Sequence, residues 1–314
     1  MSFKAVMFLF SCLGVCEVKE LRSTQEEADT RLLLHASYVV QEGREAVVIV
    51  ADDTDVLVLA LVHHYDIKGQ LYLLRGNSDT QRIIDISHVG KVLGPTVCKA
   101  LSGIHAFTGS DCTSAFSGQG ELKALKLLNK DKQYQELFAT LGLEWELSED
   151  KFQLLEEFTC HLYAARTMIS SVNTLRYHIF SAKRGNLHSK SNILPPSQDP
   201  LKQHCLRANY VAGIWKRSLE PMPNIPSPVG YGWKVNNAGH LSYLWMTCFP
   251  APAEILKMIV CDCRNECTPP SCPCASAGIT CIEACNLKEC ENVHVMDDRV
   301  ECDDEDSDDD TYCS

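Results

Sequence analysis

The chain has 314 residues, of which 45% are hydrophobic and 22% are charged, and its formal net charge is −12. This composition is ordinary for a soluble globular protein, and it excludes collagen-like, wholly disordered and multi-span membrane classes. The length predicts two domains, or one large domain with an appendage. Much of the charge lies in residues 297–310, where ten acids and one Arg give a net charge of −9. The acidic character of the chain therefore comes mainly from this C-terminal tail.

The N-terminal residues hold an apolar run, Ala5 to Phe10, directly after Lys4. We interpret this run as a buried strand or as a start left by truncation. A secretory signal peptide is the alternative, but a single Lys is a weak cationic region and no small-x-small cleavage site follows. No apolar run reaches the roughly 18–20 residues of a transmembrane helix, so we expect no membrane contact.

Helix and strand patterns alternate in the first third of the chain. They predict a helix at 24–42, a strand at 46–51, a helix at 56–62, and strands at 71–74 and 82–86. Thr24 is the expected N-cap of the first helix, and the first strand has the β-branched pattern of a strand buried on both faces. This alternation predicts an α/β fold with a parallel sheet. Residues 89–180 read as mostly helical, and the prolines between 185 and 253 predict an extended or irregular region.

Three groups of acids lie at the ends of these α/β elements. They are Glu27 and Asp29 at the start of the first helix, Asp53 and Asp55 after the first strand, and Asp111 in a Gly-Ser-Asp-Cys-Thr segment. Sites in open α/β sheets form beyond the carboxyl ends of strands, and carboxylates there bind Mg²⁺ or Mn²⁺. Two such ions support phosphodiester cleavage. Each acid alone is more simply a helix cap, so the prediction rests on the order of the three groups.

This order of motifs resembles the internal region of flap-endonuclease (XPG-type) nucleases of the PIN-like superfamily. The resemblance covers about residues 24–130 and includes Glu-Ala-Asp opening a helix, Asp-Thr-Asp-Val-Leu after a strand, and Leu-Ser-Gly-Ile-His-Ala-Phe-Thr-Gly-Ser-Asp-Cys-Thr. It implies that Glu27 and Asp29 contribute to a first metal site and that Asp53, Asp55 and Asp111 form a second. In that family, the last block leads into a helix–turn–helix variant that grips duplex DNA.

Two departures from the family pattern bear on activity. Only 23 residues precede the first motif, and none supplies the matching aspartate. The resemblance therefore implies a copy of the family's fold that lacks the N-terminal half. In such a copy, the central strand of the sheet is missing or is replaced by residues 3–10. Cys112 also stands where the family usually has Tyr. We expect a truncated or degenerate metal-dependent nuclease; a competent endonuclease is the alternative.

Eight of the 17 Cys lie within 30 residues near the C-terminus: Cys261, Cys263, Cys267, Cys272, Cys274, Cys281, Cys285 and Cys290. Close thiolate pairs suit tetrahedral Zn²⁺, and so small a segment has no other means of ordering itself. A disulfide knot or an unstructured Cys-rich tail is the alternative. The block resembles a tesmin-type CXC domain that ends in Cys-Glu-Asn, a domain in which nine cysteines share three zinc ions and which binds DNA. Leu287 replaces the ninth Cys. We therefore expect two closed zinc sites, with three ions and a further donor such as His294 as the alternative.

Residues 158–219 hold nine cations against one acid, Asp199; these cations are Arg166, Arg176, Lys183, Arg184, Lys190, Lys202, Arg207, Lys216 and Arg217. Aromatic residues are interleaved, so the segment predicts a phosphate-binding face, for which we expect every one of these cations except Lys202 to contribute. A solvated surface that balances acidic segments elsewhere is the alternative. His63, His64 and His105 are more simply core or helix-surface residues than ligands.

Together these features predict five parts: a PIN-like α/β region at 1–130, a helical extension at 131–184, a Pro-rich irregular region at 185–256, a CXC zinc module at 257–294 and an acidic disordered tail at 295–314. The same pairing of modules resembles uncharacterised, transposon-associated animal proteins. We expect a nuclear protein with DNA as its partner, RNA being the alternative, with structural zinc and with Mg²⁺ or Mn²⁺. A non-catalytic protein-interaction scaffold is the third hypothesis.

Overall fold

The computed structural model describes residues 18–76, 80–182, 194–248, 261–264, 266–276, 281, 285–287, 290 and 292. Residue contacts divide the chain into two units, Met1–Thr247 (unit 1) and Cys248–Ser314 (unit 2). The predicted strand at 3–10 and the acidic tail lie outside the described residues. No helix in the described part of the chain is long and apolar enough to cross a membrane.

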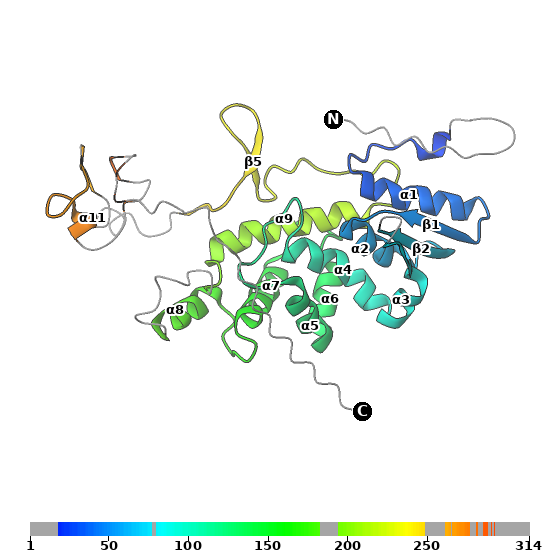
Figure 1. Ribbon diagram of the computed structural model, residues 1–314, viewed down its shortest axis with the longest axis horizontal. Helices are drawn as coiled ribbons and strands as arrows, with labels where there is room; N and C mark the ends of the chain where they lie inside the picture. Colours follow the sequence, from blue (N-terminus) through cyan, green and yellow to red (C-terminus); the bar gives the residue numbers. More distant parts are fainter. Residues whose placement is uncertain are drawn as a thin grey trace. The chain divides into compact units, whose positions relative to one another are not determined.

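Unit 1 contains a small mixed sheet and a larger set of helices (Figure 1). Its helices are η1 (Lys19–Leu21), α1 (Ala28–Gln41), α2 (Thr54–His63), α3 (Ile86–Leu93), α4 (Pro95–Thr108), α5 (Glu121–Lys130), α6 (Lys132–Thr140), α7 (Glu149–Tyr163), α8 (Val172–Ala182) and α9 (Gln198–Lys216). Its strands are β1 (Ala46–Val50), β2 (Gln70–Arg75), β3 (Arg82–Asp85), β4 (Trp233–Val235) and β5 (Leu241–Tyr243). The described part of unit 2 contains the short helix α11 (Pro273–Ser276). The predicted α/β region, helical middle and C-terminal Cys cluster are therefore confirmed.

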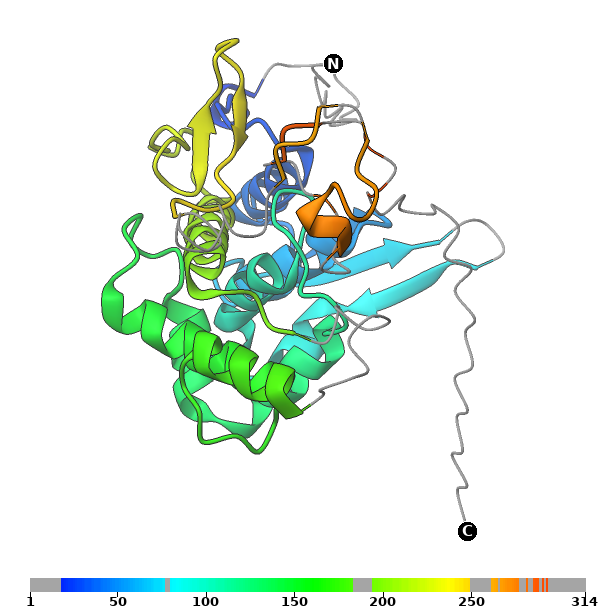
Figure 2. The same ribbon diagram turned by 90° about the vertical axis from the view of Figure 1, so that its left-hand side faces the viewer.

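The main sheet has the strand order β1-β2-β3, with β2 and β3 side by side in Figure 2. β1 and β2 are parallel, as predicted, because α2 provides the crossover between them. β2 and β3 are antiparallel, so the prediction of an all-parallel sheet is wrong for β3. Only residues 76–81 separate these two strands, whereas a parallel connection needs a dozen residues or more.

β1 is buried on one face and exposed on the other. Ile49 is buried, whereas Val48 is 53% exposed and Val50 is 69% exposed. Their register partners Tyr72 and Leu74 are only partly buried. The prediction that β1 is buried on both faces is therefore wrong. In the described part of the chain, β1 pairs with β2 alone, and no second layer of helices covers this face.

The first helix begins four residues later than its predicted N-cap. Thr24 lies before the helix, and Glu27 takes the N-cap position without a side-chain capping bond. The Gln25 amide nitrogen donates to the carbonyl oxygens of Ser218 and Glu220, at 2.9 Å and 2.6 Å. These contacts hold the segment before α1 against the end of α9, so the chain turns into the helix only at Ala28.

The predicted irregular region contains a 19-residue helix, α9. Prolines cluster before and after this helix, and Pro200 lies in its first turn, where a missing N–H costs nothing. α9 packs along α4 (Figure 1), and both helices belong to one hydrophobic core that extends from Leu33 to Trp233. The α/β elements, the helical middle and the hairpin of β4 and β5 are thus parts of one compact unit.

Candidate metal centres

The structure brings three acids from two separate helices of unit 1 together. Asp29 lies in the first turn of α1, and Asp53 and Asp55 occupy the N-cap and first turn of α2. One carboxylate oxygen from each of these three residues lies within 4.8 Å of the others. This spacing is small enough for one divalent cation to contact all three side chains.

The other two predicted acids, Glu27 and Asp111, border this group. We call the five acids together the acidic cluster. Glu27 immediately precedes α1, and Asp111 lies in the turn after α4. Burial raises the pKa of Glu27, a hydrogen bond from Trp215 partly opposes this rise, and the charges of Asp29, Asp55 and Asp111 add to it. Electrostatic contact thus links Glu27 and Asp111 to the three close carboxylates.

The pKa of Asp29 is also raised, first by burial and then by the charges of Asp53, Asp55 and Asp111. Ionising like-charged carboxylates together costs free energy, and a bound cation offsets that cost. Asp53 has a second role, because its Oδ1 accepts a hydrogen bond from the backbone N–H of Asp55 at 2.9 Å. This N-cap bond fixes one oxygen of Asp53 and leaves the other available to a ligand.

His105 of α4 connects the acidic cluster to α5. Its Nε2 donates to Asp55 Oδ1 at 2.8 Å, and its Nδ1 donates to Glu121 Oε1 at 2.9 Å. Burial opposes protonation of this ring, but the two hydrogen bonds outweigh it and raise the pKa of His105 to about 9. The imidazolium therefore holds the Asp55 carboxylate in place.

Trp215 of α9 completes this network. Its indole ring stacks on His105 with ring centroids 5.5 Å apart, and its Nε1 donates to Glu27 Oε2 at 3.2 Å. His63 Nε2 donates to the carbonyl oxygen of Trp215 at 3.0 Å, so this buried His is a core residue. Side chains from α4, α5 and α9 thus form one network that orients Asp55 and Glu27.

Replacing His105 should change how stability depends on pH. The pKa of His105 is raised in the folded chain, so the stability that it contributes is complete below about pH 6.5 and is lost as pH rises through about 9. In EDTA, the free energy of unfolding of the wild type should fall by about 3 kcal/mol more across this range than that of His105→Gln. Urea unfolding at several pH values measures the difference, and parallel pH profiles would contradict it.

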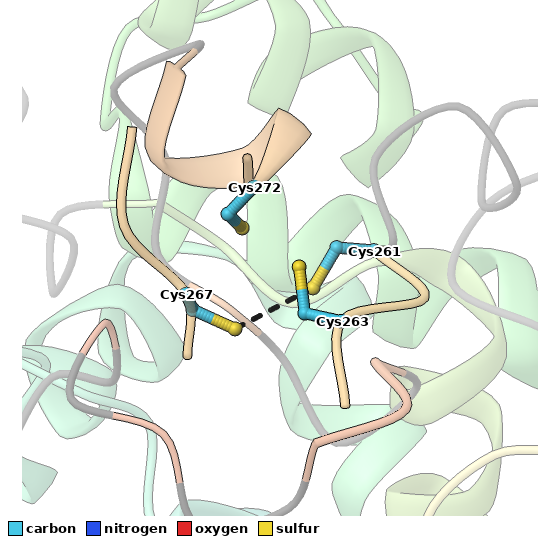
Figure 3. A group of neighbouring side chains, drawn as sticks. All are labelled: Cys261, Cys263, Cys267 and Cys272. Carbon is cyan, nitrogen blue, oxygen red and sulfur yellow. Dashed lines mark hydrogen bonds between the residues drawn. The ribbon is translucent and has the colours of Figure 1, made fainter. Parts of the chain in front are cut away.

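The Cys cluster of unit 2 forms three overlapping groups of thiols. They are Cys261, Cys263, Cys267 and Cys272; Cys261, Cys272, Cys274 and Cys281; and Cys267, Cys281 and Cys290. Within each group the sulfur atoms lie within 4.8 Å of one another. Figure 3 shows the first group, in which Cys261, Cys263 and Cys267 lie in irregular segments and Cys272 directly precedes α11. These groups can hold metal ions, and thiolates favour zinc among the common ones.

Cys285 joins the same cluster through Cys274, since their sulfur atoms lie 3.9 Å apart. All eight predicted thiols therefore lie together. The backbone N–H of Ala275 donates to Cys272 Sγ at 3.5 Å, and this bond lowers the pKa of the Cys272 thiol, which favours the thiolate that binds metal. His294, the predicted alternative donor, lies outside the described residues.

Three of the predicted phosphate-binding cations instead hold unit 1 together. Arg207 is only 2% exposed, and its Nη1 donates to the carbonyl oxygens of Gly232 and Leu244. Its assignment to a phosphate face is therefore wrong, because a phosphate cannot reach its buried guanidinium. Lys216 donates to a carbonyl oxygen of α4, and Arg217 donates to three backbone carbonyls near the end of α6 and in α9.

The remaining cations of that segment divide into three sets. Arg166 and Arg176 are exposed, and Arg176 also donates to the carbonyl oxygen of Pro195. Lys183, Arg184 and Lys190 lie outside the described residues. Lys202 pairs with Glu149 at 3.0 Å. The phosphate face thus stays a prediction that rests on fewer residues than the sequence count indicates.

Comparisons with protein families, with curated proteins and with solved structures find no match for this chain. The resemblances to flap-endonuclease type nucleases and to CXC domains therefore stay predictions from their motifs. What the geometry establishes is coarser: an acidic triad in unit 1 and a Cys cluster in unit 2, each able to hold metal.

Proposed function

We propose that unit 1 is a divalent-cation-dependent phosphodiester hydrolase acting on nucleic acid. The observation that carries the proposal is the approach of three carboxylates from α1 and α2 to within 4.8 Å of one another. The acids face one another at the carboxyl end of β1, which is where α/β proteins place their sites. DNA is the expected substrate and RNA is the alternative.

The residues around the acids support this assignment. Mg²⁺ or Mn²⁺ bound by such carboxylates generates hydroxide from water and stabilises the leaving oxygen of a phosphodiester. Asp29, Asp53 and Asp55 would hold the ions, and Glu27 and Asp111 would extend the site. His105 fixes Asp55, and Trp215 fixes Glu27, so both carboxylates are oriented before a ligand arrives.

We propose further that unit 2 is a zinc-stabilised module that contributes to nucleic-acid binding. Four of its thiols belong to two groups each: Cys261, Cys267, Cys272 and Cys281. Shared thiols of this kind favour sulfurs that bridge neighbouring ions, and thus the alternative with three zinc ions over two separate sites. Few basic residues lie in the module, so its own affinity for DNA should be weak.

The proposed activity is tested by incubating the full chain with fluorescently labelled oligonucleotides. Single-stranded, duplex and flapped DNA and single-stranded RNA would each be incubated with Mn²⁺, with Mg²⁺, and with EDTA. We expect at least one substrate to be cleaved in Mn²⁺, no cleavage in EDTA, and recovery when excess Mn²⁺ is added to the EDTA sample. Absence of cleavage with every substrate would overturn the catalytic proposal.

A further inference from the structure

A pocket of about 610 Å³ adjoins the acidic cluster of unit 1. Its volume is in the range that proteins use to bind small organic molecules. Glu27 and Cys112 line it. Glu27 belongs to the acidic cluster, and Cys112 follows Asp111 directly in the chain. The pocket and the acidic cluster therefore share Glu27.

One wall of the pocket is aromatic. Trp233 and Tyr243 are directly opposed on β4 and β5, with ring centroids 6.4 Å apart and ring planes inclined by 33°. Tyr210 of α9 packs against Trp233 at 5.4 Å, and its hydroxyl donates to the carbonyl oxygen of Pro226 at 2.8 Å. Tyr243 remains 40% exposed. The ring of Trp245 and the guanidinium of Arg207 also approach the Tyr243 ring, at 5.3 Å and 5.7 Å from its centroid, so a ligand would stack on the part of the ring that lines the pocket.

The polar side of the pocket carries acceptors and no cation. Among the described residues that line it, Glu26 and Glu27 are charged and none is Lys or Arg. A phosphate would be repelled there, whereas the N–H donors of a ligand would find carboxylate acceptors. The aromatic wall and the two carboxylates suit a ligand that is planar and apolar on its faces and that bears N–H donors at its edge.

We propose that this pocket binds a nucleobase with an exocyclic amino group, next to the phosphodiester held at the acidic cluster. Stacking on Tyr243 would hold the base, and Glu26 would accept from its amino group. Adenine, cytosine and guanine carry such a group, whereas thymine and uracil do not. This inference rests on the proposed hydrolase function, because it identifies the base of the nucleotide whose phosphate would be held at the acidic cluster.

The binding step can be tested without metal and without phosphate. The full chain would be titrated calorimetrically with adenosine and with thymidine in EDTA. We expect adenosine to bind more tightly than thymidine. Tyr243→Ala should weaken adenosine binding about 5- to 150-fold, which is the usual loss for one base–aromatic stack. Tyr243→Phe should retain binding, because stacking needs the ring and not the hydroxyl.

Val235→Ala is the matched control. Val235 lies on the same hairpin, is 54% exposed and does not line the pocket, so its loss should leave adenosine affinity unchanged. Equal affinity of Tyr243→Ala and wild type, or no binding of adenosine, would overturn the inference. If Mn²⁺-dependent cleavage occurs with a KM that Tyr243→Ala does not change, the hydrolase proposal stands and the base pocket fails. If adenosine binds as expected but no substrate is cleaved, the pocket stands and the hydrolase proposal fails.

Discussion

Replacing Asp53 by Asn should lower Mn²⁺-dependent cleavage by about 100- to 1000-fold, because it removes one charged ligand from three close carboxylates. The substitution keeps the local structure, since Asn caps helices as well as Asp does. The bond from the Asp55 N–H to the side-chain oxygen at position 53 can therefore persist. Initial cleavage rates at saturating Mn²⁺ measure the effect.

Asp131→Asn provides a matched control for this variant. Asp131 caps α6 through the same kind of bond, accepting from the backbone N–H of Gln133 at 2.8 Å, and it belongs to none of the acidic groups described above. Its replacement should leave the cleavage rate unchanged. Equal rates for Asp53→Asn and Asp131→Asn would show that the charge at position 53 has no part in catalysis.

Removal of zinc should unfold the Cys module and leave unit 1 folded. The buried residues of this cluster are its cysteines, so apolar packing cannot offset the entropy of the chain. Structural zinc supplies on the order of 10–16 kcal/mol in modules of this size. A strong chelator added to the full chain should make residues 261–292 sensitive to proteases, while the far larger core of unit 1 resists cleavage.

Cys272→Ser tests the same cluster by substitution. Cys272 belongs to two of the three thiol groups, so its loss should lower the zinc content by at least one ion per chain. Cys248→Ser is the control, because Cys248 belongs to none of the groups and its replacement should leave zinc content unchanged. Elemental analysis of both purified variants decides the matter. Unchanged zinc in Cys272→Ser would show that the cluster does not hold metal as proposed.

The acids and the cysteines could be predicted because their signals are local. Asp53 and Asp55 follow a β-branched strand directly, and the cysteines are spaced a few residues apart, so neighbouring positions in the sequence report on one site. The start of α1 could not be placed as well, because Gln25 is held by backbone groups about 190 residues away. Tertiary contact overrode the local capping signal of Thr24.

The supporting residues of the acidic cluster were missed for the same reason. His105 and Trp215 are 110 positions apart and meet only because α4 packs on α9. Neither residue stands in a pattern that indicates hydrogen bonds to carboxylates. Arg207 was misread because counting cations over a segment assumes that all of them reach solvent, whereas a helix in a core buries one side. A helical projection of α9 would have separated the buried positions, including Arg207 and Trp215, from the exposed ones.

The most direct test of the central claim is the binding of Mn²⁺ to unit 1. Calorimetric titration would compare the full chain, saturated beforehand with added zinc, with the double variant Asp53→Asn plus Asp55→Asn and with Asp131→Asn. We predict that the wild type and Asp131→Asn bind Mn²⁺ alike and that the double variant loses this binding. Mn²⁺ binding of unchanged affinity and stoichiometry in the double variant would contradict the assignment of these carboxylates as a cation site.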